Sequence, residues 1–118
     1  MYGVVKVGNK EVEMCANAAT PVRYRQVFGK NLLTYFLGRA SEDEMTAMIP
    51  ELAYIMAMSA AKADMNKLSI AGYIEWLEGF EGLDFLEAAT AEEIMRIYQA
   101  NELPDAVSKK KQGQRKGK

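Results

Sequence analysis

The sequence predicts a mainly α-helical protein, with a small helical domain at residues 1–105 that begins with a short β-hairpin, and a flexible basic tail at 106–118. Three observations support this fold class. The segment from Glu44 to Lys67 is apolar on nearly all sides of a 3.6-residue helical wheel, which is typical of a helix surrounded by other elements. Valines flank a Gly-Asn pair near the N-terminus, which favours a hairpin. Six of the last ten residues are basic.

Composition sets the broad class. The 118 residues suffice for one modest core, and 49% apolar with 26% charged residues is typical of a globular protein. No apolar run approaches the roughly 20 residues that span a bilayer, and the apolar stretch at the N-terminus is too short for a signal peptide. A single cysteine, Cys15, allows no intramolecular disulfide. We therefore expect a cytoplasmic protein.

The absence of histidine argues against an enzyme, because histidine is the commonest general base and the commonest metal ligand. We expect no cofactor and no metal site.

The net charge of −1 conceals an uneven distribution of charged residues along the chain. The six basic residues of the tail follow a body with nine basic and sixteen acidic residues, a net charge of −7.

The hairpin is predicted at 3–15, with Gly8-Asn9 as its turn. A helix at about 20–28 opens with a Thr20 N-cap and Pro21 at its first position, and Gly29 ends it. A second short helix, at 31–38, ends at Gly38.

The central helix is predicted at 42–65, where Ser41 and Glu44 form a capping box. Pro50 lies inside it and indicates either a kink or a break near Ile49. The sequence leaves this choice open. The predicted inner face contains Met45, Met48, Ile49, Leu52, Ile55, Met56, Ser59, Ala60 and Ala63.

Two further helical regions follow. One is predicted at 69–80, capped by Ser69, with Tyr73 and Trp76 on its apolar face. The other is predicted at 84–101. Capping-box patterns at Asp84 with Glu87 and at Thr90 with Glu93 fit either one helix or two consecutive helices.

No residue pattern indicates catalysis. The carboxylates Glu75, Glu78, Glu81 and Asp84 are better explained as a solvated face than as a glycosidase-like pair. Cys15 has no histidine partner and is interpreted as a buried, inert thiol. The basic tail is the best candidate for contact with nucleic acid, although no aromatic residue lies among its charges.

Methionines gather on the central helix, where flexible side chains either fill an irregular core or form an adaptable binding surface. The predicted helices supply apolar faces that cover Leu52, Ile55 and Met56. The opposite side then lacks a cover, so we predict that it meets a client or a second subunit. The predicted contact residues are Tyr54, Met58, Ala61 and Met65, and Arg23 and Arg25 are candidates for ion pairs with an acidic neighbour in another subunit.

Three ordered blocks, at 18–33 (AATPVRYRQVFGKNLL), 52–57 (LAYIMA) and 76–101 (WLEGFEGLDFLEAATAEEIMRIYQAN), resemble the tail assembly chaperones of long-tailed bacteriophages of Gram-positive bacteria. The resemblance extends from about Cys15 to Asn101, over aromatic and apolar packing positions rather than a catalytic signature.

The resemblance implies a small helical protein that binds the phage tape-measure protein, keeps it soluble and helps to recruit tail-tube subunits. It also implies self-association, a location in the host bacterial cytoplasm, absence from the mature virion, and a longer product made by ribosomal frameshifting that contacts the tail-tube protein. The run Lys109-Lys110-Lys111 fits a slippery site near the end of the gene. The alternative function is a small nucleic-acid-binding or regulatory protein that acts through the basic tail.

Overall fold

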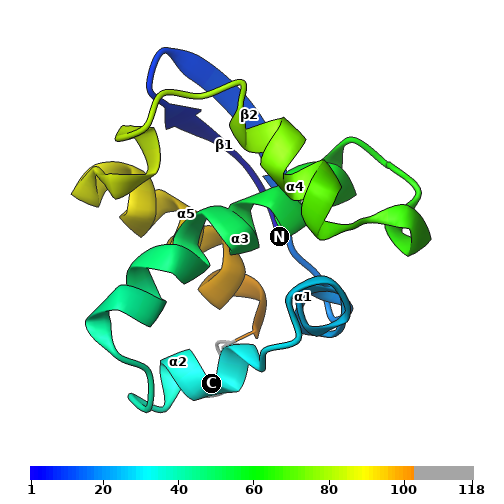
Figure 1. Ribbon diagram of the computed structural model, residues 1–118, viewed down its shortest axis with the longest axis vertical. Helices are drawn as coiled ribbons and strands as arrows, with labels where there is room; N and C mark the ends of the chain where they lie inside the picture. The colour runs from blue at the N-terminus through cyan, green and yellow to red at the C-terminus, as the bar shows by residue number, and fades with distance from the viewer. Residues whose placement is uncertain (103–118) are drawn as a thin grey trace, which may run out of the picture.

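The computed structural model describes residues 1–102, and the side chains of residues 1–99. It confirms the predicted fold class, because helices pack around a central helix and one two-stranded antiparallel hairpin stands at the N-terminus. The predicted tail at 106–118 lies outside the described residues. Figure 1 shows α3 (Glu42–Ala60) crossing the middle of the molecule, with the hairpin at one end and α2 (Leu32–Phe36) at the other.

The hairpin pairs β1 (Tyr2–Val7) with β2 (Lys10–Cys15), in the register that sets Val5 opposite Val12. Gly8 has a φ of +63°, which suits the tight turn between the paired strands and which glycine adopts without strain. A Cβ at Gly8 would also lie 2.5 Å from the carboxylate of Asp84. The turn therefore packs closely against Asp84, which is far away in the sequence.

Two short helices follow the hairpin. The helix α1 (Thr20–Phe28) ends at Gly29, whose φ of +71° confirms the predicted C-cap. Thr20 is not the N-cap, since it is already helical and its hydroxyl accepts a hydrogen bond from the backbone N–H of Asn17 at 2.9 Å. The helix α2 is shorter than predicted, with the side chain of Asn31 as its cap.

The capping box that starts α3 is confirmed. Ser41 Oγ accepts from the Glu44 N–H at 3.1 Å, and the Glu44 carboxylate accepts from the Ser41 N–H at 2.8 Å. The helix continues through Pro50 without a break, although the missing N–H leaves one ladder hydrogen bond unmade.

The predicted end of this helix, at residue 65, is wrong. α3 ends at Ala60, and Lys62 then adopts a φ of +58° that no α-helix can contain. Met65–Lys67 forms a separate 3₁₀ turn, η1, capped by the side chain of Asp64.

The last two helical regions differ from the prediction in length and in their caps. The helix α4 (Ile70–Leu77) stops before residue 80. Of the two alternatives for 84–101, the structure has two consecutive helical elements, the 3₁₀ turn η2 (Asp84–Leu86) and α5 (Ala88–Glu102), because Glu87 between them is extended. Neither predicted capping box exists: Asp84 accepts from the Glu81 N–H, and Thr90 donates its hydroxyl hydrogen bond to the Lys6 carbonyl at 3.3 Å.

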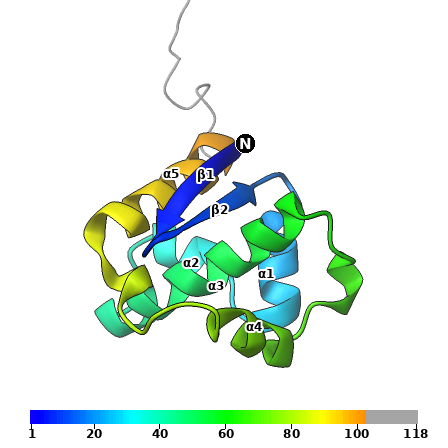
Figure 2. The same ribbon diagram turned by 90° about the horizontal axis from the view of Figure 1, so that it is seen from above.

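The core lies between the hairpin and the helices. β2, α1, α4, α5 and η2 all contact α3 (Figure 2). Within α3 every residue from Leu52 to Ala57 is buried, on all sides of the helix. The all-round apolarity of this segment thus reflects burial on all sides, as its wheel predicts.

Candidate functional site

Tyr54, the first of the predicted contact residues, lies inside the fold. Its side chain is 3% exposed, and its ring packs at 5.5 Å from Tyr73 and 5.6 Å from Trp76 of α4. Burial raises the pKa of its hydroxyl, although a hydrogen bond with the Ser69 backbone acts in the opposite direction. The prediction that this residue faces a client or a second subunit is wrong.

The error concerns which face of α3 the helix α4 covers. Ser69 caps α4, and Gly72 brings it so close that a Cβ would lie 2.9 Å from the Tyr54 hydroxyl. The apolar periodicity of the sequence predicts instead that α4 covers Leu52, Ile55 and Met56. Those residues are fully buried in the common core, where α3 meets β2 and α5.

The other predicted contact residues of α3 line a groove beside the hairpin. Met58 is half-buried and Ala61 is exposed. We call this feature the β2 groove; its volume is about 260 Å³ and its lining residues are Glu11, Val12, Glu13, Ala57, Met58, Ala61 and Trp76. Two of these lining residues, Glu11 and Glu13, are acidic, and the others are apolar.

Met65 and Arg23 occupy a different hollow, next to Ser59 and Thr20. The Arg23 guanidinium donates to Gln26 at 3.0 Å and to Asn66 at 2.9 Å, so it links α1 to η1. Arg25 is exposed. The six predicted contact residues therefore form no single surface: Tyr54 is buried, Met58 and Ala61 line one groove, and Arg23 and Met65 line another hollow.

A larger apolar groove lies between α2 and the C-terminal part of α5. We call it the α2 groove; its volume is about 440 Å³ and its lining residues are Pro21, Asn31, Leu33, Phe36, Leu37, Tyr98 and Gln99. Phe36 stacks on Tyr98 with the ring centroids 5.3 Å apart. Leu33 is 53% exposed and Leu37 is 58% exposed, so apolar side chains reach the opening.

Sequence reasoning missed the α2 groove, although the signal was available. The segment LLTYFLGR carries large apolar residues on every side of a very short helix. Leu32 and Tyr35 enter the core and Phe36 packs against it, whereas Leu33 and Leu37 remain exposed. A short helix that is apolar on all sides but attached on one side must leave hydrophobic residues in solvent.

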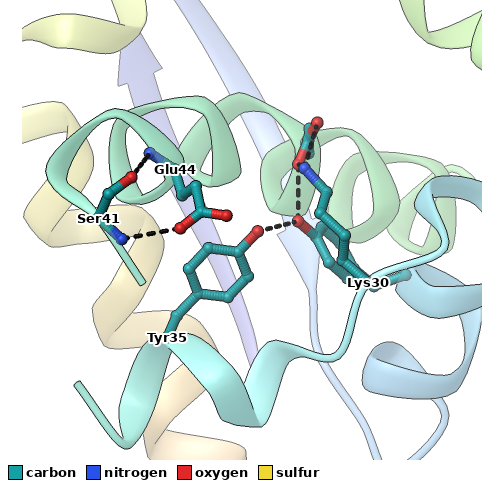
Figure 3. Close-up of polar contacts among 6 residues, drawn as sticks. Lys30, Tyr35, Ser41 and Glu44 are labelled. Atoms are coloured by element: carbon teal, nitrogen blue, oxygen red, sulfur yellow. Dashed lines mark hydrogen bonds and ion pairs between the residues drawn. The ribbon is translucent and has the colours of Figure 1, made fainter. Parts of the chain in front are cut away.

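A cluster of polar side chains lies between α1, α2 and α3 (Figure 3). The Tyr24 hydroxyl donates to the Glu51 carboxylate at 2.6 Å and lies 3.3 Å from the Tyr35 hydroxyl. Lys30 completes an ion pair with Glu51 at 3.2 Å. We call these four residues the Glu51 cluster. They join α1, the α1–α2 connection and α2 to α3.

The Glu51 cluster shifts the pKa of two groups. Burial, with the hydrogen bond to Glu51, raises the pKa of the Tyr24 hydroxyl far above its usual range. Partial burial of Lys30 acts to lower the pKa of its ammonium, but the hydrogen bond and charge of Glu51 outweigh it and raise that pKa. The Glu51 carboxylate contributes to both shifts, in addition to burial for Tyr24, so its removal would disturb the whole cluster.

Comparison with known proteins found no matching family, no matching curated protein and no matching solved structure. Within residues 1–102, no three His, Cys, Asp or Glu side chains gather closely enough to hold a metal ion. No helix of the described chain is long and apolar enough to cross a membrane. Cys15 is half-buried at the end of β2, opposite Tyr2.

Proposed function

We propose that this protein is a phage tail assembly chaperone, which binds the tape-measure protein without catalysis and keeps it soluble until tail-tube subunits are recruited. The ordered blocks at 18–33, 52–57 and 76–101 support the family. The α2 groove is the observation that carries the binding function, because it exposes leucines beside an open apolar hollow. The proposal places the protein in the host cytoplasm as a homo-oligomer and excludes it from the mature virion.

The α2 groove suits an apolar helical ligand. Leu33 and Leu37 are one helical turn apart and both stand more than half exposed, while Phe36 and Tyr98 form a stacked wall. An amphipathic helix binds such a groove by inserting apolar side chains at positions i, i+3, i+4 and i+7. A tape-measure protein is rich in helices whose apolar faces are uncovered before assembly, so it would supply this ligand.

The test is co-expression with the tape-measure protein encoded by the same phage. The wild-type chain is expected to keep the tape-measure protein in the soluble fraction and to co-purify with it. The double substitution Leu33→Asp with Leu37→Asp is expected to abolish both effects, because it puts two charges into the groove. Leu83→Asp is the matched control, since Leu83 is 72% exposed and does not line the groove.

Circular dichroism must first show that each variant is folded. A tape-measure protein that stays insoluble and unbound with the wild-type chain would contradict the proposed function. Retention of binding by the double variant would leave the function standing but move the client away from the α2 groove.

The proposed longer product is tested on the gene itself. A run of adenines encoding Lys109, Lys110 and Lys111 would form the heptamer on which a ribosome shifts frame. Mass spectrometry of the protein expressed from the native gene is expected to reveal a second, longer chain with the same N-terminus. Interspersed AAG codons with no slippery heptamer near the stop codon would contradict this expectation.

A further inference from the structure

The hollow that contains Thr20 and Arg23 gathers hydrogen-bond donors that have no acceptor. We call it the Thr20 hollow; its volume is about 220 Å³. Its polar lining consists of Asn17, Thr20, Arg23 and Ser59, and its other lining residues are apolar. None of these residues is acidic, and within the described part of the chain Arg23 forms no ion pair. The hollow therefore holds a positive charge without a counter-charge.

The guanidinium of Arg23 is held in place by two hydrogen bonds. Its Nη1 donates to Gln26 at 3.0 Å and to Asn66 at 2.9 Å, where the chain after α3 passes beside α1 (Figure 2). The N–H groups of Nη2 and Nε have no acceptor among the described residues. These two nitrogens form one edge of the planar guanidinium, and such an edge binds a carboxylate through two parallel hydrogen bonds. Because the side chain is already fixed, a ligand loses little of its binding free energy to ordering it.

The hydroxyl of Thr20 is a buried donor in the same hollow. The Thr20 side chain is 3% exposed. Its Oγ1 accepts from the Asn17 N–H at 2.9 Å, but its own O–H donates to no described residue. A buried donor without an acceptor is unfavourable, and an acceptor atom of a ligand would remove this penalty.

Ser59 adds a hydroxyl from α3. A helical serine or threonine often donates to the carbonyl four residues earlier, as Thr46 does to Glu42 at 3.0 Å. Ser59 makes no such bond to any described residue, and it lines the hollow instead. The side-chain oxygen of Asn17 accepts from the Ala19 N–H at 2.8 Å, which leaves its amide nitrogen to donate. Four side chains thus offer donors to one small space.

We propose that the Thr20 hollow binds a carboxylate with a short apolar stem. The carboxylate accepts from Nη2 and Nε of Arg23 and from the hydroxyls of Thr20 and Ser59, while Ile55 and Met65 contact the stem. One positive charge matches the single charge of a carboxylate better than the charge of about −1.5 to −2 on a phosphate group at pH 7. The hollow is smaller than the roughly 300–1,000 Å³ of pockets for drug-sized ligands, so its ligand is small.

Two sources carry this chemistry: a free short-chain carboxylate, and a glutamate side chain of another protein. Butyrate is the probe for the first source. Glutamate with an acetylated amino group and an amidated α-carboxyl group is the probe for the second. n-Butylammonium, which has the same stem as butyrate but the opposite charge, is the matched control ligand.

The test is an NMR titration of the full-length protein at pH 6.5 and constant ionic strength, followed through the Arg23 Nε–H signal and the backbone amides around the hollow. Butyrate is expected to shift these signals with a Kd of about 1–10 mM, as suits so small a ligand. n-Butylammonium is expected to produce no saturable shift. The tighter of the two carboxylate probes identifies the source.

Matched variants assign the binding to this hollow. Ser59→Ala is expected to weaken binding about threefold to tenfold, because it removes one donor and breaks no hydrogen bond within the described chain. Arg23→Gln is expected to abolish saturable binding. Arg25→Gln has the same charge change at an exposed residue outside the hollow and is expected to keep the Kd within about twofold.

The dispersion of the backbone spectrum shows whether each variant is folded, and Ser59→Ala decides the test if Arg23→Gln unfolds. Shifts that stay linear in the concentration of both carboxylates would mean that the hollow holds only water, and they overturn the proposal. Butyrate binding of equal strength in wild type and in Ser59→Ala also overturns it, as does saturation by inorganic phosphate but by neither carboxylate. The Thr20 hollow shares no lining residue with the α2 groove, so none of these results bears on the proposed chaperone function.

Discussion

Glu51 is the residue on which the attachment of α1 and α2 to α3 most depends. Its carboxylate accepts from Tyr24, which is 0% exposed, and pairs with Lys30. Glu51→Ala is expected to lower the free energy of unfolding by about 1–3 kcal/mol, because a buried hydroxyl loses its acceptor and a half-buried ammonium loses its counter-charge. Urea unfolding at pH 7, followed by circular dichroism, measures the change.

Two matched variants test the cause. Glu51→Gln keeps a neutral acceptor for Tyr24 and is expected to cost less than Glu51→Ala. Glu78→Gln, on the exposed surface of the molecule, is expected to change stability by less than about 0.5 kcal/mol. Equal stability of Glu51→Ala and Glu78→Gln would show that the Glu51 cluster contributes nothing.

Tyr73 links stability to alkaline pH. Burial, with a smaller contribution from the charge of Glu51, raises the pKa of its hydroxyl to about 12. The unfolded chain ionises this group near pH 10, so its contribution is complete below pH 10 and is lost as the pH rises from 10 to about 12. Stability is expected to fall across this window.

Tyr73→Phe removes the ionisable group and is expected to reduce that fall, while changing stability little at pH 7. Urea unfolding at several pH values from 9 to 11.5 compares the two proteins. Parallel curves for wild type and Tyr73→Phe would contradict the assignment of the pKa shift to Tyr73.

At the scale of single elements, the end of α3 gives the clearest prediction. Lys62 has a φ of +58°, a conformation that costs an L-residue roughly 1 kcal/mol and costs glycine nothing. Lys62→Gly is therefore expected to stabilise the protein by about 0.5–1 kcal/mol. Lys67→Gly, in the η1 turn where φ is negative, is the control and is expected to destabilise. Thermal unfolding ranks the two, and the reverse order would contradict the prediction.

Elements with complete local signals were predictable from sequence. The turn at Gly8, the cap at Gly29 and the capping box at Ser41 each depend on residues within a few positions. Thr90 and Glu93 show the limit, because the same local pattern exists but Thr90 bonds to Lys6, 84 residues away. No glycine marks the end of α3 at Ala60, because the residue with positive φ that follows is Lys62.

The candidate surface was harder to predict, since it depends on which faces meet. Periodicity identified an apolar face on α4 but did not show that this face covers Tyr54. Once α4 is placed there, the exposed apolar side chains are those of α2, such as Leu33 and Leu37. Which apolar side chains stay exposed depends on how all the helices pack against one another. It therefore follows from the tertiary structure and cannot be predicted from any one segment.

At the scale of the whole molecule, the first strand, β1, packs against the last described helix, α5, and this contact joins the two ends of the described chain. Gly3 of β1 faces Ile97 of α5, and a Cβ at Gly3 would lie 2.7 Å from Ile97 Cδ1. Gly3→Ala is expected to destabilise by about 1–3 kcal/mol, because Ile97 is 1% exposed and has little room to move. Ile97→Val removes the clashing methyl group and alone is expected to cost about 0.5–1.5 kcal/mol.

The double variant is expected to lose less stability than the two single losses combined, by at least about 0.5 kcal/mol, because valine makes room for the new Cβ. Urea unfolding of the four proteins in this cycle measures the coupling. Gly3→Ala with Ser41→Ala is the control cycle, since both hydrogen bonds of the Ser41 cap go to Glu44. Its changes are expected to add. Equal additivity in both cycles would mean that β1 and α5 are not in contact in solution, and the closed arrangement of hairpin, α3 and α5 would then be wrong.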